Sequence, residues 1–267
     1  MCKYFILTPF FPSENSFRGS YILDQSKAIK RNSKYDLTVI ILSSLYHKSN
    51  GNYVIDGINC FTFKIFDLPS FIFPGLFNFI NQVRFNRFLI KNNLKINNNS
   101  IVHGHITYPS LCYIKFIYNK VKCKTILQHH GLDILQFQTG LKIPFLKNLQ
   151  NSILKKRFVN SSSYVKLHIA VSKIVKSKII EINNLIENDI YICINGVDTS
   201  KFYQEKNPIK NNSFTIGCVA NFWKLKDQIS LLKAVAILNN KGIKNIRVEF
   251  VGDGVTKKMC EKFAKKK

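Results

Sequence analysis

Polar residues able to do chemistry follow several apolar runs of this sequence. His103 and His105 come at the end of one run, and His130, Gly131 and Asp133 come directly after another. A histidine can hydrogen-bond a hydroxyl group, and its charge changes with protonation near neutral pH. Ligands bind beyond the carboxyl ends of strands in open parallel sheets. If these apolar runs are such strands, the side chains belong to one candidate site.

The same histidines also suggest a metal site as an alternative. His103 and His105 are two residues apart and therefore share one face of a strand. Together with His129 or His130 they could hold zinc, which would indicate a metal-dependent hydrolase. No acidic ligand follows them at a suitable spacing. We therefore predict that the site holds no metal.

A second group of polar residues lies late in the sequence, after two further apolar runs. Asn221 and Lys226 follow the first of these runs, and Gly252 follows the second. Lys226 precedes Asp227, which we expect to cap the next helix, so the ammonium group would lie beside the positive end of that helix. Such a position suits a phosphate group. The alternative is an ordinary solvated lysine in a lysine-rich chain.

The glycines argue against a nicotinamide dehydrogenase. Gly252 and Gly254 lack the third glycine of the dinucleotide-binding motif, because Lys257 stands in its place. The first apolar run is followed by a proline-rich loop that ends at Gly19, again without that motif. Taken alone, Gly19 is a loop glycine that needs an unusual φ angle.

Apolar runs and amphipathic segments alternate along the chain, as in doubly wound α/β proteins. The opening pattern of strand, loop, helix and strand is a βαβ unit and predicts a parallel sheet. We expect two successive Rossmann-like, doubly wound parallel-sheet domains. The predicted strands are 3–7, 37–42, 100–104, 125–128, 167–171, 190–194, 214–220 and 247–251, with one or two more in 52–66. The predicted helices start with Ser20 as a cap, cover 110–119, 144–158 and 228–239, and follow Ser172 and Gly254.

The two predicted domains meet near the pair Asn195-Gly196. This pair follows the run 190–194, which reads as a buried strand, and the polar residues after it do not alternate as a second hairpin strand would. We predict an N-terminal domain over 1–196, a linker over 197–212 and the start of a second domain over 213–267. The second domain has room for two strands and two helices, which leaves an open sheet edge and suggests that it is incomplete.

The segment 71–90 is rich in phenylalanine and contains Arg84 and Arg87. Aromatic residues flanked by arginine suit a helix that lies at a membrane surface. The alternative is a core helix in a phenylalanine-rich protein, and the sequence leaves both open. No window approaches the length of a transmembrane helix.

The formal net charge of +25 raises the question of a nucleic-acid or membrane partner. The lysines are spread along a chain that is also rich in asparagine, isoleucine and phenylalanine, as an A/T-biased coding sequence would produce. No nucleic-acid recognition motif occurs, so we predict no nucleic-acid partner and favour an anionic membrane surface or another polyanion. The seven cysteines are scattered without a Cys-x-x-Cys pair, which indicates a reducing compartment and a cytoplasmic protein.

Seven short segments resemble, in the same order, those of the family-four glycosyltransferases. These enzymes use nucleotide sugars and have two facing Rossmann-like domains, the GT-B fold. Each match is weak alone, but together they cover essentially the whole chain. The segments are 9–31 with its glycine, Ile101-Val102-His103-Gly104-His105, Leu127-Gln128-His129-His130-Gly131-Leu132-Asp133-Ile134, Ala170-Val171-Ser172, Asn195-Gly196-Val197-Asp198-Thr199, Ile216-Gly217-Cys218-Val219-Ala220-Asn221 and Phe250-Val251-Gly252-Asp253-Gly254.

The resemblance implies a retaining transferase that moves a sugar from a nucleotide-diphosphate donor to a glycan or lipid-linked acceptor. Cell-surface polysaccharide synthesis at the inner membrane face is the setting that it implies. The sequence has no Asp-x-Asp, so we expect a metal-independent and cofactor-free site in which cations and helix N-termini stabilise the leaving diphosphate.

The resemblance also assigns residues. His130 matches the histidine that touches the donor sugar near the reacting carbon; the alternative is a structural histidine at a strand end. The residues implied on the donor side are Gly19, Asn221, Lys226 and Gly252, and those implied on the acceptor side are His105 and Asp133.

Two features depart from the family. Asn221 stands where the family usually has arginine, and Asp227 stands where it has glycine, which removes one cation near the diphosphate. The glutamate pair of the family's second domain is missing, since only Glu261 follows Gly254. We therefore expect a truncated second domain and a chain that is weakly active or inactive. The alternative function is a non-catalytic basic module that binds a membrane surface or a polyanion.

Overall fold

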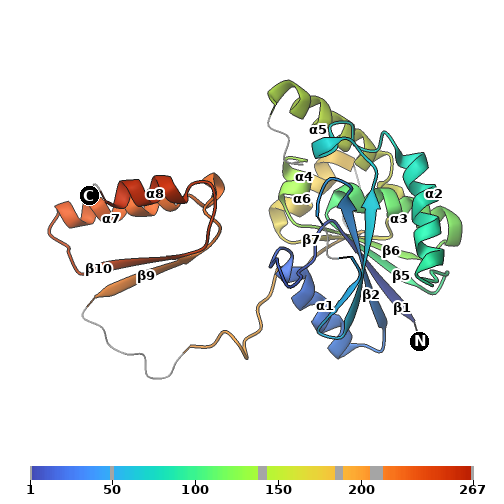
Figure 1. Cartoon of the computed structure of the whole chain (residues 1–267), viewed down its shortest axis with the longest axis horizontal. Coiled ribbons are helices and arrows are strands. Elements are labelled where there is room, and N and C mark those ends of the chain that lie inside the picture. Colours follow the sequence, from blue (N-terminus) through green and yellow to red (C-terminus); the bar gives the residue numbers. More distant parts are fainter. Residues whose placement is uncertain (1, 49–50, 138–142, 184–188, 205–212, 266–267) are drawn as a thin grey trace. The chain divides into compact units, whose positions relative to one another are not determined.

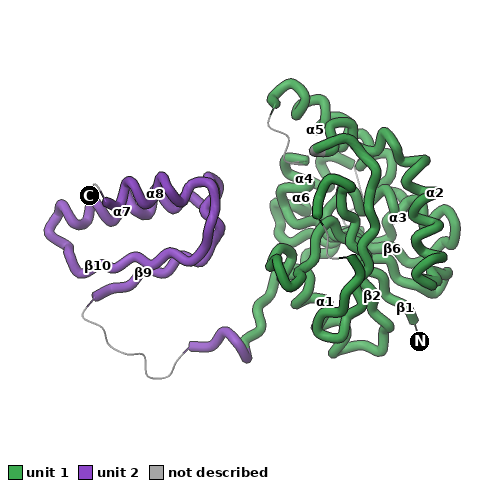
Figure 2. The backbone as a smooth tube through the Cα atoms, in the orientation of Figure 1, with its two compact units in different colours: residues 1–199 green, residues 200–267 purple. Residues whose placement is uncertain are grey.

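The protein has two compact units, Met1–Thr199 and Ser200–Lys267 (Figures 1 and 2). The computed structural model describes residues 2–48, 51–137, 143–183, 189–204 and 213–265. We describe each unit by itself. The predicted linker 197–212 lies partly outside the described residues.

Unit 1 is built on one sheet of eight strands in the order β3-β4-β2-β1-β5-β6-β7-β8. All neighbouring strands are parallel except β3 and β4, which form an antiparallel pair. The predicted α/β fold with a parallel sheet is therefore confirmed. The strands are β1 Lys3–Thr8, β2 Asp36–Ser44, β3 Tyr53–Ile55, β4 Ile58–Ile65, β5 Ile101–His105, β6 Lys124–His129, β7 Leu167–Ala170 and β8 Ile190–Ile192.

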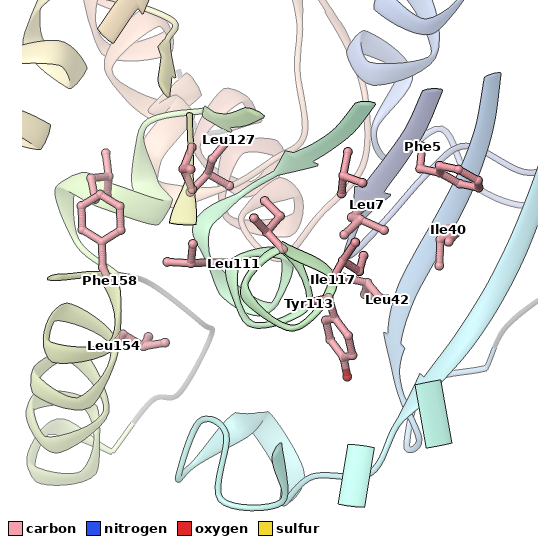
Figure 3. Packing of buried hydrophobic residues seen from close by; sticks show 14 of the residues in the cluster. Phe5, Leu7, Ile40, Leu42, Leu111, Tyr113, Ile117, Leu127, Leu154 and Phe158 are labelled. Carbon is pink, nitrogen blue, oxygen red and sulfur yellow. The ribbon is translucent and has the colours of Figure 1, made fainter. Parts of the chain in front are cut away.

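The central strands are buried on both faces, which explains why they read as continuous apolar runs. Along β1, Phe5 and Leu7 belong to one core cluster, whereas Tyr4 and Ile6 belong to the cluster on the opposite face. This alternation follows from the two-residue period of a strand. Figure 3 shows the first cluster, in which Ile117 of α3 lies beside Leu7 of β1 and Leu42 of β2.

The helices of unit 1 cover both faces of the sheet. Ile22 and Leu23 of α1 pack in one core cluster, and buried residues of α2, α3, α5 and α6 pack in the other. Parallel sheets are stable in this sandwiched arrangement because both apolar faces are removed from water. The helices are α1 Ser20–Asn32, α2 Asn78–Lys91, α3 Thr107–Val121, α4 Leu132–Leu135, α5 Pro144–Val159 and α6 Lys173–Asn183.

The ends of two helices test the predicted caps. Gly19, in a left-handed conformation, occupies the N-cap of α1, so the prediction that Ser20 is the cap is wrong by one residue. At the start of α6 the prediction is confirmed, because the Ser172 hydroxyl accepts a hydrogen bond from the Val175 N–H at 3.2 Å.

The run 190–194 is not the buried strand that its apolar residues predict. Its regular part, β8, lies at the edge of the sheet, and Ile190 is buried while Tyr191 and Ile194 are largely exposed. An edge strand has a neighbour on one side and less covering from helices, so its outward side chains stay in water.

The phenylalanine-rich segment contains a core helix, as one of the two predictions has it, and the membrane-surface alternative stays a prediction. The α-helix begins only at Asn78, and Phe85 is fully buried with its ring 5.1 Å from that of Phe63. The opposite side of α2 exposes Phe79 and Ile90, which are 78% and 72% accessible. The helix is therefore a core helix that also presents an apolar outer surface.

Unit 2 consists of two parallel strands, β9 Phe214–Val219 and β10 Ile246–Val251, with α7 Gln228–Asn240 and α8 Lys257–Ala264. Within the described residues 213–265, no side chain of β9 or β10 is buried. A two-stranded sheet with little burial is marginally stable in water. Among the described residues of the unit, Phe222, Gln228 and Cys260 are buried.

Candidate functional site

Two histidines of β5 share one face of the sheet, as their spacing predicts. The rings of His103 and His105 are stacked with centroids 4.3 Å apart, and both are buried. Gly104 between them faces α3, where an added Cβ would lie 2.7 Å from the Ile114 side chain. The close approach of α3 therefore occupies one face of β5 and leaves the other face to the histidines.

His105 extends this stack to the end of β6. Its Nδ1 lies 3.0 Å from Nε2 of His130, within hydrogen-bond distance, and the two rings are 5.2 Å apart. At the far end of the stack, the Tyr4 hydroxyl lies 2.8 Å from Nδ1 of His103. A continuous series of aromatic rings thus runs from Tyr4 in the core to His130 beyond the strand end.

Asp133 fixes the backbone that follows β6. Its Oδ1 accepts a hydrogen bond from the His130 backbone N–H at 2.9 Å. Its Oδ2 accepts two hydrogen bonds of 3.0 Å from Thr107, one from the backbone N–H and one from the hydroxyl. Burial alone would raise the pKa of Asp133, but hydrogen bonding and the nearby His129 and His130 lower that pKa to about 2. The carboxyl group is therefore ionised at neutral pH and acts purely as an acceptor.

This carboxylate gives direction to a second series of hydrogen bonds. The Thr107 hydroxyl donates to Asp133, so it must accept from Nδ1 of His129, which lies 3.1 Å away. Nε2 of His129 in turn lies 3.1 Å from Nδ1 of His168, within hydrogen-bond distance. The series joins β7, β6 and the start of α3. The sequence reasoning missed Thr107 and His168, and the contact of His168 depends on strand order, which no spacing along the chain reveals.

Four histidines of the site, His103, His105, His130 and His168, are neutral at pH 7. Burial first, and then the neighbouring histidines, lower the pKa of His103 and His168 to about 3. Burial also lowers the pKa of His130 to about 4, although Asp133 acts in the opposite direction. The pKa of His105 lies well below its ordinary value for the same reasons of burial and neighbouring histidines. A neutral imidazole has one donor and one acceptor, which suits hydrogen bonding to a hydroxyl group.

The zinc alternative gains no support from this geometry. Facing nitrogens of His105 and His130 are at hydrogen-bond distance from each other. Across the ranges that the structure describes, no three His, Cys, Asp or Glu side chains are grouped so that they could hold a metal ion.

The start of α1 lies against the histidines at the end of β6. Gly19 has φ +88°, and a Cβ at this position would lie 3.0 Å from the Phe10 carbonyl oxygen, so the loop requires glycine here. The ring of Tyr21, in the first turn of α1, lies 4.8 Å from the ring of His130. One turn further on, Gln25 donates a hydrogen bond of 2.8 Å to Gln128 in β6.

A cleft of about 380 Å³ lies beyond the carboxyl ends of β1 and β2, next to the Gly19 loop. Aromatic rings of Phe10, Phe11 and Tyr53 line it together with hydroxyl groups and the basic side chains of Arg18 and Lys48. Rings and hydroxyl groups in one concave surface suit a polar ring-shaped ligand such as a sugar.

The predicted acceptor-side residues do not line this cleft. His105 is fully buried, and Asp133 is bonded to Thr107 and to the backbone of His130. Their geometry indicates that they position other groups. Contact of either side chain with an acceptor stays a prediction.

The predicted donor-side residues other than Gly19 lie in unit 2. Lys226 is exposed at the end of the 3₁₀ turn Lys224–Lys226, and Asp227 is the N-cap residue of α7, as predicted. The Asp227 carboxylate accepts from the Ser230 hydroxyl at 2.8 Å and not from a backbone N–H.

The loops after β9 and β10 contact each other in unit 2. A Cβ at Gly252 would lie 2.2 Å from the Ala220 carbonyl oxygen, so glycine is required for this packing. The backbone carbonyl of Asn221, the next residue, accepts from Nε2 of Gln228 at 3.0 Å. A donor-binding role for Asn221, Lys226 and Gly252 stays a prediction.

Comparison with solved protein structures identifies the type of fold. No family model matches the chain, and no curated protein sequence matches it. Among solved structures, the E. coli trehalose-6-phosphate protein bound with UDP-2-fluoro glucose matches 99% of this chain and 68% of its own, with TM-score 0.59 and 10% identity. The chain has a GT-B glycosyltransferase fold.

Two further solved structures have a fold similar to that of this chain. TarM matches with TM-score 0.63 and 9% identity over 100% of this chain and 74% of its own. The lipopolysaccharide outer core galactosyltransferase WaaB, in its apo form, matches with TM-score 0.57 and 13% identity over 99% of this chain and 64% of its own. Likeness at such low identity concerns the fold alone. In the described ranges, no helix is long and apolar enough to cross a membrane.

Proposed function

We propose that this protein is a glycosyltransferase that moves a sugar from a nucleotide-diphosphate donor to a glycan or lipid-linked acceptor. The observation that carries the proposal is the geometry and charge of the N-terminus of α1 in a chain with a GT-B fold. Gly19 brings this helix start close to the Phe10 backbone, and the first turn contains no acidic residue. The positive end of the helix dipole there suits a diphosphate.

His130 lies beside this helix start and is the residue that we propose to contact the donor sugar. Its ring is held between His105 and Tyr21, and it is neutral at pH 7. A neutral imidazole can hydrogen-bond a sugar hydroxyl without adding positive charge near a developing oxocarbenium centre.

We also propose the finer features that the family resemblance implies. The reaction retains the anomeric configuration, needs no metal, and uses Lys226, Asn221 and Gly252 on the donor side. The acceptor binds in the cleft lined by Phe10, Tyr53 and Arg18.

Isothermal titration of the full chain with UDP-glucose, GDP-mannose, ADP-glucose and the three free diphosphates tests the proposal. We expect one nucleotide to bind in both forms. Lys226→Ala should weaken that binding about tenfold, because an ion pair with a phosphate is lost. Lys224→Ala, which changes a neighbouring exposed lysine in the same turn, is the matched control and should change it little. Absence of binding by all six compounds would refute the proposal.

The exposed face of α2 favours a second role in membrane attachment. Phe79, Ile80, Val83 and Ile90 are exposed there, together with the basic Arg87. Such a face suits the boundary between headgroups and acyl chains of an anionic membrane. Flotation with phosphatidylglycerol liposomes tests it, and Phe79→Ser with Ile90→Ser should abolish the association. Salt-sensitive liposome binding by a chain with no nucleotide affinity would favour a non-catalytic basic module over the transferase.

A further inference from the structure

A cavity among the helices of unit 1 has no part in the proposed reaction. It has a volume of about 150 Å³ and lies between α2, α3 and α5. Three of its apolar lining residues, Leu111, Leu154 and Phe158, are labelled in Figure 3. Thr107 is the one lining residue that also belongs to the histidine site, and its hydroxyl group already donates to Asp133.

Two basic side chains line this cavity without a counterion. Lys115 comes from α3 and Arg157 from α5, and both are half-buried. In the part of the chain that the structure describes, neither of them forms an ion pair with a carboxylate. Nζ of Lys115 lies 4.9 Å from the centre of the Tyr164 ring. Partly buried charges without a counterion are unfavourable, so the cavity favours an anion.

The guanidinium group of Arg157 is fixed by its contact with Gly75. A Cβ at position 75 would lie 2.7 Å from Cζ of Arg157, so the glycine leaves room for this group. Nη2 donates a hydrogen bond of 3.3 Å to the Gly75 carbonyl oxygen. Nε is buried and has no partner among the described residues. The donors that remain for a ligand are therefore those of the two terminal nitrogens.

Both positive charges act at the same point of the cavity. Burial raises the pKa of the Cys112 thiol, whereas Arg157 and Lys115 both act to lower that pKa. Asp67 acts with burial and is the smallest of these influences. Nδ2 of Asn78 lies 3.8 Å from the Cys112 sulfur. A guanidinium, an ammonium and an amide donor thus converge near one wall of the cavity.

The chemistry of the lining suits a phosphate group. None of the lining residues is acidic, and α2, α3 and α5 contain no aspartate or glutamate. The amide of Gln82 and the hydroxyl of Ser161 add neutral donors. A guanidinium matches two phosphate oxygens at once, and the remaining oxygens accept from the other groups. The volume lies below the roughly 300 Å³ at which pockets for larger ligands begin, which excludes a nucleotide sugar.

We propose that this cavity binds the phosphate group of a small molecule. Arg157 holds two of its oxygens, Lys115 neutralises its charge, and the amides of Asn78 and Gln82 donate the remaining hydrogen bonds. The site is built within unit 1 and shares no charged residue with the start of α1. It therefore does not rest on the proposed transferase function.

Titration of the full chain with inorganic phosphate and with glycerol 3-phosphate, followed by ¹H–¹⁵N NMR, tests the proposal. We expect saturable shifts of the Arg157 Nε–H and Asn78 amide signals, which sodium chloride at equal ionic strength does not cause. Arg157→Gln should weaken binding about tenfold or more, because a charge-assisted pair of hydrogen bonds is lost. Lys156→Gln removes the same charge from the neighbouring exposed position of α5 and should bind as the wild type does.

Two results would overturn the proposal. One is the absence of saturable shifts in the wild-type chain with both compounds, and the other is equal affinity of Arg157→Gln and the wild type. Circular dichroism shows whether Arg157→Gln is folded. If it is not, Lys115→Gln takes its place in the comparison, with the same expected loss of affinity and the same contrary result.

UDP and GDP separate this site from the proposed nucleotide site. We expect the nucleotide that binds to leave the phosphate-dependent shift of Arg157 in place. Displacement of phosphate from Arg157 would mean that the cavity belongs to the nucleotide site and would overturn the proposal of a separate one. If neither nucleotide binds while phosphate still shifts Arg157, the proposed transferase fails and the phosphate site stands.

Flotation with phosphatidic acid vesicles distinguishes a lipid headgroup from a soluble compound, since both carry the same phosphate group. Loss of flotation in Arg157→Gln but not in Lys156→Gln would assign the cavity to the headgroup. Equal flotation of both variants, together with the shifts described above, would assign it to a soluble phosphate compound.

Discussion

Asp133 holds the backbone of His130, not its ring: the carboxylate Oδ1 accepts a hydrogen bond from the His130 N–H at 2.9 Å. The other oxygen accepts from Thr107 at the start of α3. A single buried carboxylate therefore ties the end of β6 to the beginning of a helix that packs on the sheet. The location of His130 follows from this link, and its ring lies within hydrogen-bond distance of His105.

We expect Asp133→Asn to destabilise unit 1 by about 2–4 kcal/mol, because the amide NH₂ would face N–H and O–H donors. Urea unfolding followed by circular dichroism measures the change. Asp24→Asn alters an exposed carboxylate in α1 and is the control; its effect should stay within about 0.5 kcal/mol. Equal stability of the two variants would show that the bonds to Thr107 and His130 contribute nothing.

The same carboxylate predicts a loss of stability in acid. Its pKa is about 2 in the folded protein and 3.8 is the ordinary value, so its contribution is complete above about pH 5 and is lost as the pH falls towards 2. In the Asp133→Asn variant this part of the pH dependence should be missing between pH 4 and pH 2. Identical acid curves for both proteins would contradict the assignment.

The buried histidines act in a higher pH range. The pKa of His103 and of His168 is about 3, and that of His130 is about 4, all below the ordinary 6.5. Their contribution is present above pH 6.5 and falls as the unfolded chain takes up protons between pH 6.5 and 4. His168→Gln should make the slope of unfolding free energy against pH shallower by about one proton in this range. His47→Gln, at an exposed histidine outside the cluster, is the variant for comparison.

Gly19 and Gly242 form a matched pair for testing the helix start. Their φ angles are +88° and +89°, but an added Cβ meets the Phe10 carbonyl at Gly19 and nothing within 4 Å at Gly242. Alanine at either position should cost about 1–2 kcal/mol of backbone strain. Only Gly19→Ala should also displace the loop and weaken nucleotide binding, by about tenfold or more. Equal binding by both variants in calorimetry would remove Gly19 from the site.

Unit 2 should exchange its amide protons faster than unit 1. Its strands β9 and β10 have no buried side chain among the described residues, whereas β1 and β5 are buried along nearly their whole length. Local opening needs less free energy where little apolar surface is covered. Hydrogen exchange followed by mass spectrometry should show protection of 3–8 and 101–105 that persists long after 214–219 has exchanged. Equal protection of both units would contradict this view.

Several parts of the fold were predictable because they depend on local pattern. The apolar run of β1 and the alternation of strands with amphipathic helices indicate a parallel α/β sheet, since each run must be covered on both faces. Errors arose where burial depends on position in the sheet. The residues of β8 are as apolar as those of a central strand, but β8 lies at the edge and Tyr191 is exposed.

Some features of the candidate site were likewise predictable from the sequence, and others were not. The order of elements in the sequence predicted three features: the ends of strands near His105 and His130, the glycine at position 19, and the helix after Lys226. The assignment of His105 and Asp133 to the acceptor side does not follow, because side-chain contacts depend on which strands are neighbours. Strand order brings His168 of β7 beside His129 of β6, and no spacing along the chain reveals this contact.

The sequence by itself therefore determined the class of fold, the approximate elements and the loops that carry polar residues, because these depend on side-chain periodicity and turn chemistry. Tertiary structure decided which of those residues are buried, which are bonded to one another and which line the cleft at Phe10. The physical reason is that strand order and helix packing bring distant residues within hydrogen-bond distance, and burial then lowers the pKa of His103, His105, His130 and His168.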